Sequence, residues 1–514
     1  MGEFELEKLW SVFLYNPKEP LIFSSGLFLF LFTAFLLIYA AIHKNQRAKI
    51  IFVTAFSLFF YYKSSGFYFV LLVLTTLVDF TMAKLIFKTE NDINFSLGNS
   101  KFNFLLSDSA VKIWRNLFLI FSLTFNLGIL FYFKYTNFFY EIYTTLSNQK
   151  FEAFDIFLPV GVSFFTFQSL SYTIDVYRRN LKPLNNPIDY AFFVSFFPQL
   201  VAGPIVRASD FIAQIFKPVV VTKEMLGRGT FLICIGLIKK AIISDYIGIN
   251  YVDRIFDNPT LYSGLENLVG VYGYALQIYC DFSGYSDMAI GIALLLGYHF
   301  NINFNSPYQS INITDFWRRW HISLSSWLRD YLYISLGGNR KGKIRMYINL
   351  FVTMLLGGLW HGAAMRFIIW GALHGIALIL HKLFTSIFTF KIKNVFVKKP
   401  LNLLSWVLTF HFVCFCWIFF RAENMQVVSQ VLNQIAFAFN GQIFMDFIKG
   451  YPVVLILMAL GFLFHFTPSS FDFSIEKMIV QTPLFLKAII LVLLIMLVVQ
   501  FRSADIQPFI YFQF

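Results

Sequence analysis

In DFWRRWHISLSSWLRDYLYI (residues 315–334), LLGGLWHG (355–362) and FIIWGALHG (367–375), a single histidine stands among tryptophan and aliphatic side chains. These histidines are His321, His361 and His374. An apolar setting disfavours the charged imidazolium and lowers the pKa of the ring. A neutral ring nitrogen is what a general base needs near pH 7. We therefore expect the chemistry in this region and a scaffold in the rest of the chain.

The composition indicates that this scaffold lies in a membrane. The chain has 514 residues, of which 58% are hydrophobic and 13% are charged, and its mean hydropathy is +0.65. Soluble domains carry about 25% charged residues. Apolar runs of roughly 20 residues, long enough to cross a ~30 Å hydrocarbon layer, recur along the chain. The sequence predicts an all-α polytopic protein of the cell inner membrane, in contact with membrane lipids.

The predicted spans number about eleven. We expect them to form one domain over residues 1–514, with a motif core at about 154–385. Segments 154–176 and 192–206 carry polar residues or prolines, which are tolerated at membrane depth where a helix is buried in protein or lines a cavity. The apolar segments are residues 21–42, 50–62, 67–87, 114–133, 154–176, 192–206, 230–247, 269–296, 347–360, 368–380, 403–420, 453–466 and 484–499.

The net charge of +13 comes from basic residues scattered over short loops, such as residues 43–49, 178–182 and 340–345. Positive loops between spans are an orientation signal of inner-membrane proteins, so we expect the loop at 43–49 in the cytoplasm and no nucleic-acid partner. The start, MGEFELEKLW, is acidic and is then expected outside. Because it lacks the basic region of a signal peptide, we expect the first span to be retained.

Residues 315–334 have the pattern of one helix, capped by Asn312 or Thr314. An arginine at the bilayer centre would cost roughly 2.5–3.5 kcal/mol, so a helix with three of them is expected at the interface or along a wet cavity. A structural role for His321, bonded to a backbone carbonyl, is the alternative. One face of this helix would carry Trp317, His321, Leu324 and Leu328.

His361 ends an apolar run, and the small residues 362–364 allow a turn and leave room for a substrate beside the ring. An ionisable residue inside a membrane is a functional candidate by default. Gly371 and Gly375 form a small-xxx-small pair suited to close helix packing. For His374 we leave a structural and a functional role open. The isolated His411 and His465 are expected to be packed polar residues.

A polar cluster lies inside the segment CDFSGYSDMAIG (280–291), where it either bonds helices together or shapes a tunnel for a substrate. Its members include Asp281, Tyr285 and Ser286. Nucleophile-elbow, Walker-A and dinucleotide-binding patterns are missing. The cysteines form neither a ligand set nor a disulfide framework. We therefore expect no metal and no bound cofactor.

Five stretches together resemble the membrane-bound O-acyltransferases, specifically the bacterial branch that acetylates alginate. They cover the middle two thirds of the chain in family order, which makes the resemblance far more specific than an isolated WHG. The stretches are LPVGVSFFTFQSLSYTIDVYRR (158–179), SFFPQLVAGPIVR (195–207), CDFSGYSDMAIG (280–291), FWRRWHISLSSWLRDYLYI (316–334) and LWHGAAMRFIIWGALHG (359–375).

The resemblance implies an outer ring of spans around a thin centre that funnels enter from both faces. It implies transfer of an acyl group, expected to be acetyl, from a cytoplasmic thioester to a hydroxyl of an extracytoplasmic polysaccharide. The donor would be acetyl-CoA or an acyl carrier protein, and a soluble accessory acetyltransferase would be a partner. On this pattern His361 matches the catalytic histidine and His321 the second functional histidine.

The residue chemistry fits this expectation. A neutral His361 would take the proton of the acceptor hydroxyl, and general-base help is worth about 10²–10⁴-fold. His321, with Arg318 or Arg319, would orient the donor or the oxyanion. The residues that we predict to bind substrate are Arg318, Arg319, Trp317, Trp320, Asp281, Tyr285, Ser286, Trp360 and His374.

Several alternatives remain open at this point. Within the family, the chain would instead transfer D-alanine to teichoic acid or an acyl group to a lipid. A transporter also carries polar residues in interrupted spans, but internal repeats, which that class predicts, are missing here. A purely structural subunit of an export machine would make the histidines replaceable.

Overall fold

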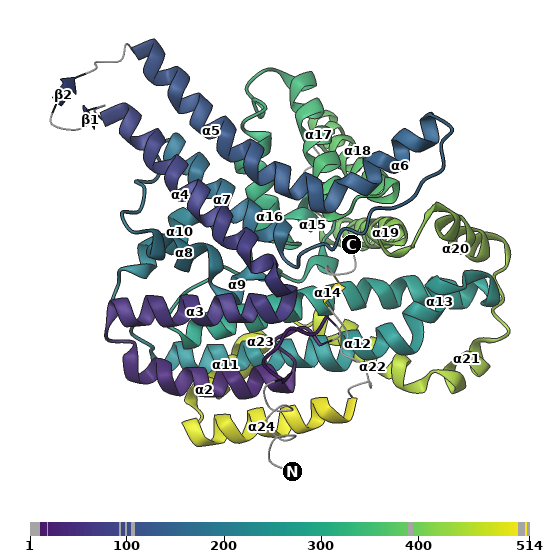
Figure 1. The fold of residues 1–514 in the computed structure, drawn as a ribbon. Coiled ribbons are helices and arrows are strands. Elements are labelled where there is room, and N and C mark those ends of the chain that lie inside the picture. Colours follow the sequence, from purple (N-terminus) through teal and green to yellow (C-terminus); the bar gives the residue numbers. More distant parts are fainter. Residues whose placement is uncertain are drawn as a thin grey trace. The chain divides into compact units, whose positions relative to one another are not determined.

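A computed structural model of the chain describes residues 11–17, 19–91, 94–97, 100–103, 108–388, 394–501 and 509–510. The chain divides into two compact units, Met1–Val220 (unit 1) and Val221–Phe514 (unit 2). The described residues are almost entirely helical (Figure 1), which confirms the predicted all-α fold. The acidic start at residues 1–10 lies outside the described residues. The single-domain organisation stays a prediction.

Unit 1 contains helices and one small hairpin, in which strand β1 (Asn94–Leu97) pairs antiparallel with β2 (Ser100–Asn103). α4 and α5 run side by side (Figure 1). The helices are α2 (Gly26–Ile42), α3 (Gln46–Ser65), α4 (Phe69–Asn91), α5 (Asp108–Leu130), α6 (Thr136–Leu146), α7 (Val162–Tyr177), α8 (Pro187–Ser195), α9 (Phe197–Leu200) and α10 (Ala208–Ile215), with a 3-10 turn η1 (Gly66–Tyr68) and a π-helical turn η2 (Phe131–Tyr135).

Phenylalanine rings fill the centre of one part of unit 1. The Phe197 ring, at the start of α9, lies 5.1–6.5 Å from a shell of aromatic rings, a distance typical of favourable ring pairs. Ser57 of α3 donates its hydroxyl to the carbonyl oxygen of Val53 and accepts from the backbone N–H of Phe197, which fixes this junction. The shell consists of Phe23, Phe28, Phe32, Phe35, Phe56 and Phe60.

The polar helix α7 is buried within unit 1. Its side chains Gln168, Ser171 and Tyr172 are fully inaccessible, and Ser163 and Asp175 are buried too. The prediction that this segment does not face lipid is therefore confirmed. The helix begins only at Val162, because the residues before it run as an irregular chain, and this shortens the predicted span at 154–176.

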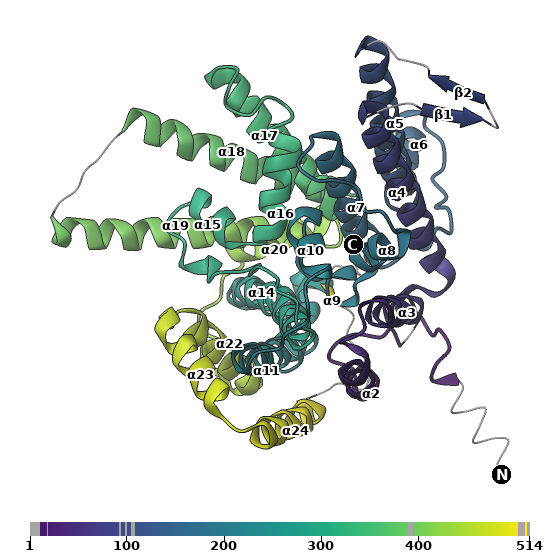
Figure 2. The same cartoon turned by 90° about the vertical axis from the view of Figure 1, so that its left-hand side faces the viewer.

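Unit 2 holds all the segments with the candidate histidines. α14 lies beside α11 (Figure 2). The helices are α11 (Lys223–Leu237), α12 (Asp245–Ile247), α13 (Asp253–Asp257), α14 (Gly264–Leu295), α15 (Ile313–Arg319), α16 (Ile322–Trp327), α17 (Lys343–His361), α18 (Met365–Ile387), α19 (Val395–Arg421), α20 (Met425–Phe437), α21 (Phe444–Gly450), α22 (Pro452–His465), α23 (Ser469–Gln481) and α24 (Leu484–Phe501), joined by π-helical η3 (Ile238–Ser244), η4 (Gly248–Val252) and η7 (Leu328–Tyr333) and 3-10 turns η5 (Pro259–Leu261) and η6 (Pro307–Gln309).

The long helix α14 is the centre of unit 2. Ser263 begins it with a capping box, in which the Ser263 hydroxyl accepts from the Glu266 N–H and the Glu266 carboxylate accepts from the Ser263 N–H. A Cβ on Gly284 would lie 2.8 Å from the carbonyl oxygen of Gly236 in α11. Glycine therefore lets the two backbones touch where α14 crosses α11.

Five stretches of the described chain are long and apolar enough to cross a membrane. The pair α21 and α22 bends by 93° and is apolar enough only when its two helices are taken together, as a broken span or a re-entrant loop. The prediction of about eleven spans is not confirmed, because several of the predicted segments are shorter, broken or polar helices packed inside protein. Segment 192–206, for example, breaks between α8 and α9. The five stretches are Gln46–Thr89, Ser109–Leu146, Met365–Ile387, Phe396–Arg421 and Leu484–Phe501.

Candidate active site

The predicted helix at residues 315–334 is broken in the structure. α15 ends at Arg319, α16 begins at Ile322, and His321 between them has left-handed backbone angles, φ 43° and ψ 57°. Asn312 caps α15, as predicted, by accepting from the Asp315 N–H at 2.8 Å. The single face expected to carry Trp317, His321, Leu324 and Leu328 is therefore divided between separate segments, although His321, Leu324 and Leu328 are all buried.

The break has a tertiary cause. The chain after α14 runs beside residues 319–322 and takes over their backbone hydrogen bonds. The N–H of Asn305 donates to the carbonyl oxygen of Arg319, and the N–H of Ile322 donates to that of Asn303, both at 2.9 Å. Trp320 turns into the core, where its ring lies 5.0 Å from that of Trp417. These contacts offset the roughly 1–2 kcal/mol that a left-handed residue costs.

His321 is fully buried at this break. Its ring meets the Phe282 ring edge-on at 4.5 Å, and its Nδ1 lies 3.2 Å from Oδ1 of Asn303. The partner is thus a side-chain amide and not the backbone carbonyl of the structural alternative. Burial lowers the pKa of His321 to about 3, so the ring is neutral at physiological pH.

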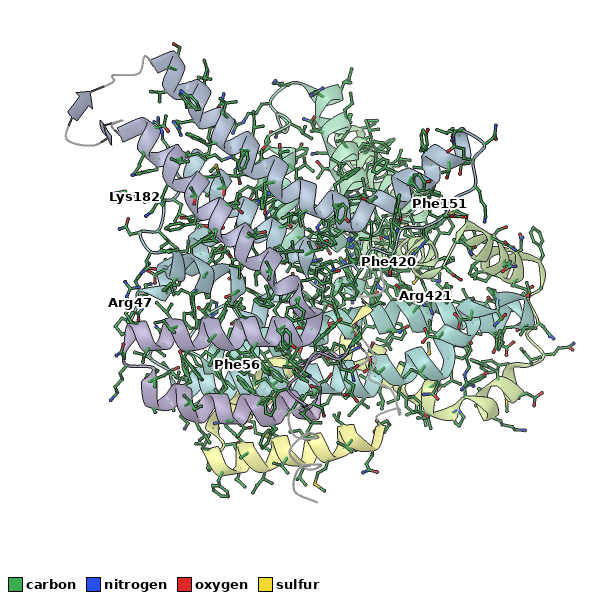
Figure 3. All side chains as sticks on the ribbon, in the orientation of Figure 1. Arg47, Phe56, Phe151, Lys182, Phe420 and Arg421 are labelled. Carbon is green, nitrogen blue, oxygen red and sulfur yellow. The ribbon has the colours of Figure 1, made fainter. Side chains whose placement is uncertain are left out.

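His361 is the last residue of α17 and is buried, 3% exposed. Its ring lies 5.0 Å from the rings of both Trp360 and Trp370 and 5.2 Å from that of Phe420. Phe420 stands at the C-terminal end of α19 (Figure 3). The predicted turn after His361 is confirmed, because α18 begins at Met365.

The small residues around His361 serve helix packing. A Cβ on Gly358 would lie 2.3 Å from the carbonyl oxygen of Phe367 and 3.0 Å from the Cα of Gly371, so α17 and α18 pack backbone to backbone. The packing role predicted for Gly371 is confirmed. A Cβ on Gly362 would meet the Phe367 ring at 2.0 Å. The expectation that Gly362 leaves room for a substrate is therefore wrong, since Phe367 occupies that space.

His374 is fully buried and belongs to the same aromatic cluster. Its ring lies 4.7 Å from that of Trp370, and its Nδ1 accepts from the indole N–H of Trp317 at 3.3 Å. An indole nitrogen only donates, so in the neutral ring of His374 the proton is on Nε2. The acceptor nitrogen of His374 is thus already occupied.

Tryptophans connect the three histidines. Trp370 contacts His361 and His374, and Trp360 contacts His361 and, at 6.3 Å between ring centres, His321. The structure therefore brings together the three side chains that the sequence singled out, inside one aromatic cluster of unit 2. Water is excluded from these rings, and electrostatic interactions are strong where water is absent.

The two candidate arginines of α15 lie apart from this arrangement. Nε of Arg319 pairs with Oδ1 of Asp315 at 3.0 Å, one turn earlier on the same helix. Arg318 is exposed. Of the tryptophans on this helix, Trp317 is half-buried and contacts His374.

The polar cluster of α14 serves mainly to bond helices together. Oδ1 of Asp281 forms an ion pair with Nζ of Lys240 at 2.5 Å, and Oδ2 accepts from the N–H of Ile510 at 2.8 Å. The ring of Tyr285 lies 5.1 Å from that of Phe509. Ser286 accepts from Nδ2 of Asn303 at 3.2 Å, which links the cluster to His321.

Three polar residues near the site, Lys239, Lys240 and Asn303, were not predicted from the sequence. Lys239 pairs with Asp287 at 2.7 Å. The two lysines stand side by side in the apolar run FLICIGLIKKAIISDYIGI (231–249), and such a pair inside a predicted span is itself a signal. Asn303 had no local signal, because it lies in a loop and its partners are distant in sequence.

His465 has the packed, structural role predicted for it. Its Nε2 accepts from the backbone N–H of Tyr308 at 3.0 Å, and its ring meets Tyr279 edge-on at 4.5 Å. The prediction that His411 is packed is wrong, because its side chain is exposed, where it forms a hydrogen bond with the hydroxyl of Tyr272. Within the described residues, no three His, Cys, Asp or Glu side chains gather in a metal-binding group.

Residues 177–422 match the family profile described as MBOAT, membrane-bound O-acyltransferase family. A protein of Pseudomonas aeruginosa named "Probable alginate O-acetylase AlgI" is 41% identical over 414 residues, 79% of this chain and 73% of the relative. A peptidoglycan O-acetyltransferase of Helicobacter pylori is 38% identical over 444 residues, 80% and 79% of the two chains.

A more distant relative is the teichoic acid D-alanyltransferase of Bacillus subtilis, 33% identical over 280 residues, 51% of this chain and 69% of the relative. The aligned stretch of the Pseudomonas relative covers most of both chains. The family profile includes the three buried histidines and the whole of α14. This chain belongs to the membrane-bound O-acyltransferase family.

Proposed function

We propose that this membrane-bound O-acyltransferase moves an acetyl group from a cytoplasmic thioester to hydroxyls of a polysaccharide outside the inner membrane. The observation that carries the proposal is the buried cluster of His321, His361 and His374 within the family-matched residues. Similar proteins are named for acetylation of alginate and of peptidoglycan, which are both carbohydrate polymers. An alginate-like acceptor is therefore our first choice.

His361 acts as the general base in this proposal. Its neutral ring takes the proton of the acceptor hydroxyl while the oxygen attacks the carbonyl carbon of the thioester. The C–O bond forms, the C–S bond breaks, and the proton passes from His361 to the leaving thiolate. General-base catalysis of this kind contributes about 10²–10⁴-fold. The surrounding rings of Trp360, Trp370 and Phe420 keep water away from the acyl group.

The remaining candidate residues have supporting roles. Arg318 is exposed, so its guanidinium is available to the phosphates of acetyl-CoA or the carrier's phosphopantetheine. Arg319 is held by Asp315 and fixes α15. Trp317, Trp320 and Trp360 form the aromatic wall, while Asp281, Tyr285 and Ser286 hold α14 in place from inside.

Transfer to a polymer outside the cell fits a further partner. A soluble accessory acetyltransferase would receive the acetyl group and pass it to the polysaccharide. A second candidate acyl group is D-alanine, which the similarity to the Bacillus subtilis enzyme favours. Membership in an acyltransferase family speaks against the transporter and the purely structural subunit.

The test uses purified full-length protein in sealed vesicles with labelled acetyl-CoA on one face and, on the other, a hydroxyl polymer together with the accessory acetyltransferase. Free CoA should appear only on the face that carries the loop at residues 43–49, and label should reach the polymer opposite. D-alanyl carrier protein replaces acetyl-CoA in a second arm. If intact acetyl-CoA crosses the membrane, or if cleavage persists without His361, the proposal fails.

A further inference from the structure

Asn303 lies in the loop between α14 and α15 and is buried, 1% exposed. Its side chain joins two parts of the site. Nδ2 donates to the hydroxyl of Ser286 on α14, and Oδ1 faces His321 and Ser323 at the start of α16. A buried amide with partners on both ends has a fixed orientation, because each lost hydrogen bond would leave a buried polar group unsatisfied.

The backbone settles which end of the amide is oxygen. The N–H of Ser323 points at this atom of Asn303 from 3.1 Å, and a backbone N–H is only a donor. The hydroxyl of Ser323 also lies 2.9 Å from it, closer than the 3.4 Å to Nδ1 of His321. The atom is therefore the carbonyl oxygen, and Nδ2 points at Ser286.

The orientation of Asn303 sets the tautomer of His321. Nδ1 of His321 faces the carbonyl oxygen at 3.2 Å, so it must carry the proton in the neutral ring. Nε2 then carries the lone pair. This atom is buried and makes no hydrogen bond with any residue of the described chain. His321 thus presents a dry, unoccupied acceptor nitrogen.

We propose that Asn303 is a positioning residue of the active site, which keeps the proton of His321 on Nδ1 so that Nε2 accepts a hydrogen bond from a hydroxyl of the acyl acceptor. This rests on the proposed function. A ring that holds its proton on Nδ1 has nothing to donate from Nε2, so the inference replaces the oxyanion role first considered for His321. His321 therefore contacts the hydroxyl of the acceptor and not the oxyanion.

Two other buried histidines, His374 and His465, lack this property. Nδ1 of His374 accepts from the indole of Trp317, and Nε2 of His465 accepts from a backbone N–H. In both rings the acceptor nitrogen already accepts a hydrogen bond from a donor of the protein itself. In His321 the donor nitrogen is bonded to Asn303 and the acceptor nitrogen is not bonded. The tautomer-setting role of Asn303 therefore applies to His321 alone among these three histidines.

The charged groups around His321, apart from the exposed Arg318, form ion pairs with each other, so a new charge at position 303 would act directly on this ring. Tyr285 and Cys280 of α14, Arg318 of α15 and His361 of α17 are further titratable or charged groups on these elements. The ion pairs are Asp281 with Lys240, Asp287 with Lys239, Asp315 with Arg319, and Asp330 with Arg329.

The first measurement compares acetyl transfer by full-length Asn303→Leu and Asn303→Asp with wild type, per mole of folded protein. Leucine removes the acceptor, and we expect a loss of about 100-fold, as for misplaced partners of catalytic histidines. Aspartate still offers an oxygen that accepts from Nδ1–H of His321. Asn303→Asp should therefore be at least tenfold more active than Asn303→Leu, the order of effect that outer-shell hydrogen-bond partners have.

The matched control is Asn349, a buried asparagine of α17 whose amide donates to the carbonyl oxygens of Leu336 and Gly338. Asn349→Leu and Asn349→Asp make the same chemical changes away from His321. The free energy of unfolding should fall, because carbonyl oxygens lose their donors, but activity per folded molecule should stay close to wild type. Equal losses at positions 303 and 349 would overturn the inference, because they would indicate a packing effect.

The pH profile separates positioning from packing. A carboxylate on Nδ1–H stabilises the imidazolium and raises the pKa of His321. Once protonated, Nε2 no longer accepts a hydrogen bond, so Asn303→Asp should lose activity at a higher pH than wild type on the acid side. Asn303→Leu should show no such shift. Identical profiles for the two variants would contradict the proposal.

A spectroscopic readout does not depend on activity. In ¹⁵N solid-state spectra of histidine-labelled protein, the His321 signals are those missing in His321→Gln. We expect a protonated Nδ1 and an unprotonated Nε2 in wild type, and a mixture in Asn303→Leu. A protonated Nε2 in wild type overturns this inference and leaves the proposed function standing. Absence of acyl transfer by wild type overturns the proposed function and leaves the tautomer assignment standing.

Discussion

His321 and His465 have almost the same surroundings and opposite hydrogen bonds. Both rings are buried and both meet an aromatic ring edge-on at 4.5 Å, Phe282 in one case and Tyr279 in the other. Nε2 of His465 accepts a hydrogen bond from a backbone N–H. His321 instead donates from Nδ1–H to Oδ1 of Asn303, and its Nε2 has no hydrogen-bond partner among the described residues. Burial among aromatic rings therefore does not make a histidine functional. The partner decides, because it determines which nitrogen remains for a substrate.

The largest effect is expected at His361, the proposed general base. His361→Ala should lower acyl transfer by about 10²–10⁴-fold, because it removes the proposed base. The measurement is acetyl transfer to a hydroxyl polymer by vesicles with matched amounts of protein. Wild-type transfer by this variant would remove His361 from the mechanism.

His321→Ala should come next, with a loss of about 10²-fold. Burial lowers the pKa of His321 to about 3, so the ring is neutral above that pH and charged below it. The acid side of the wild-type profile between pH 5 and 8 should therefore not report His321. A protonation of His321 seen in that window, by the ¹⁵N signals of the ring, would show that the site is wetter than the structure indicates.

Trp317→Phe tests the third histidine. Phenylalanine keeps the ring contacts to Trp370 and His374 but removes the indole N–H, so Nδ1 of His374 loses its donor. We expect a loss of stability of about 1 kcal/mol, the net value of one hydrogen bond, and less than a tenfold loss of activity. Thermal unfolding in detergent and the transfer assay measure the two. A loss equal to that of His321→Ala would place His374 in the chemistry.

The smallest effects on activity are expected at His465 and His411. His465→Leu leaves the Tyr308 N–H without its acceptor, which costs about 1–3 kcal/mol of stability, while activity per folded molecule should stay unchanged. His411 lies on an exposed face, so His411→Gln should change neither the stability nor the activity. If all four histidine variants lost activity equally, the comparison would report folding and the site assignment would be withdrawn.

Much of the site could be predicted from local patterns. The turn after His361, the cap at Asn312 and the packing role of Gly371 were all indicated by signals within a few positions of one another, in the last case by the spacing of Gly371 and Gly375. The predicted count of about eleven spans was not confirmed, because it depends on contacts between residues that are distant in sequence. An apolar segment facing lipid and one packed inside protein have similar compositions. In α14, for example, Asp281 is held by Lys240 and the N–H of Ile510, and Ser286 by Asn303.

The sequence by itself determined the class of protein, its family and the three histidines, because apolar runs and motif spacing are properties of neighbouring residues. Only the tertiary structure decided how these histidines differ. The helix breaks at His321 because the backbone of Asn303 and Asn305, which lies beyond the reach of any helical period, takes its hydrogen bonds. The side chain of Asn303 then determines the proton on the ring, since a hydrogen-bond partner depends on proximity in space.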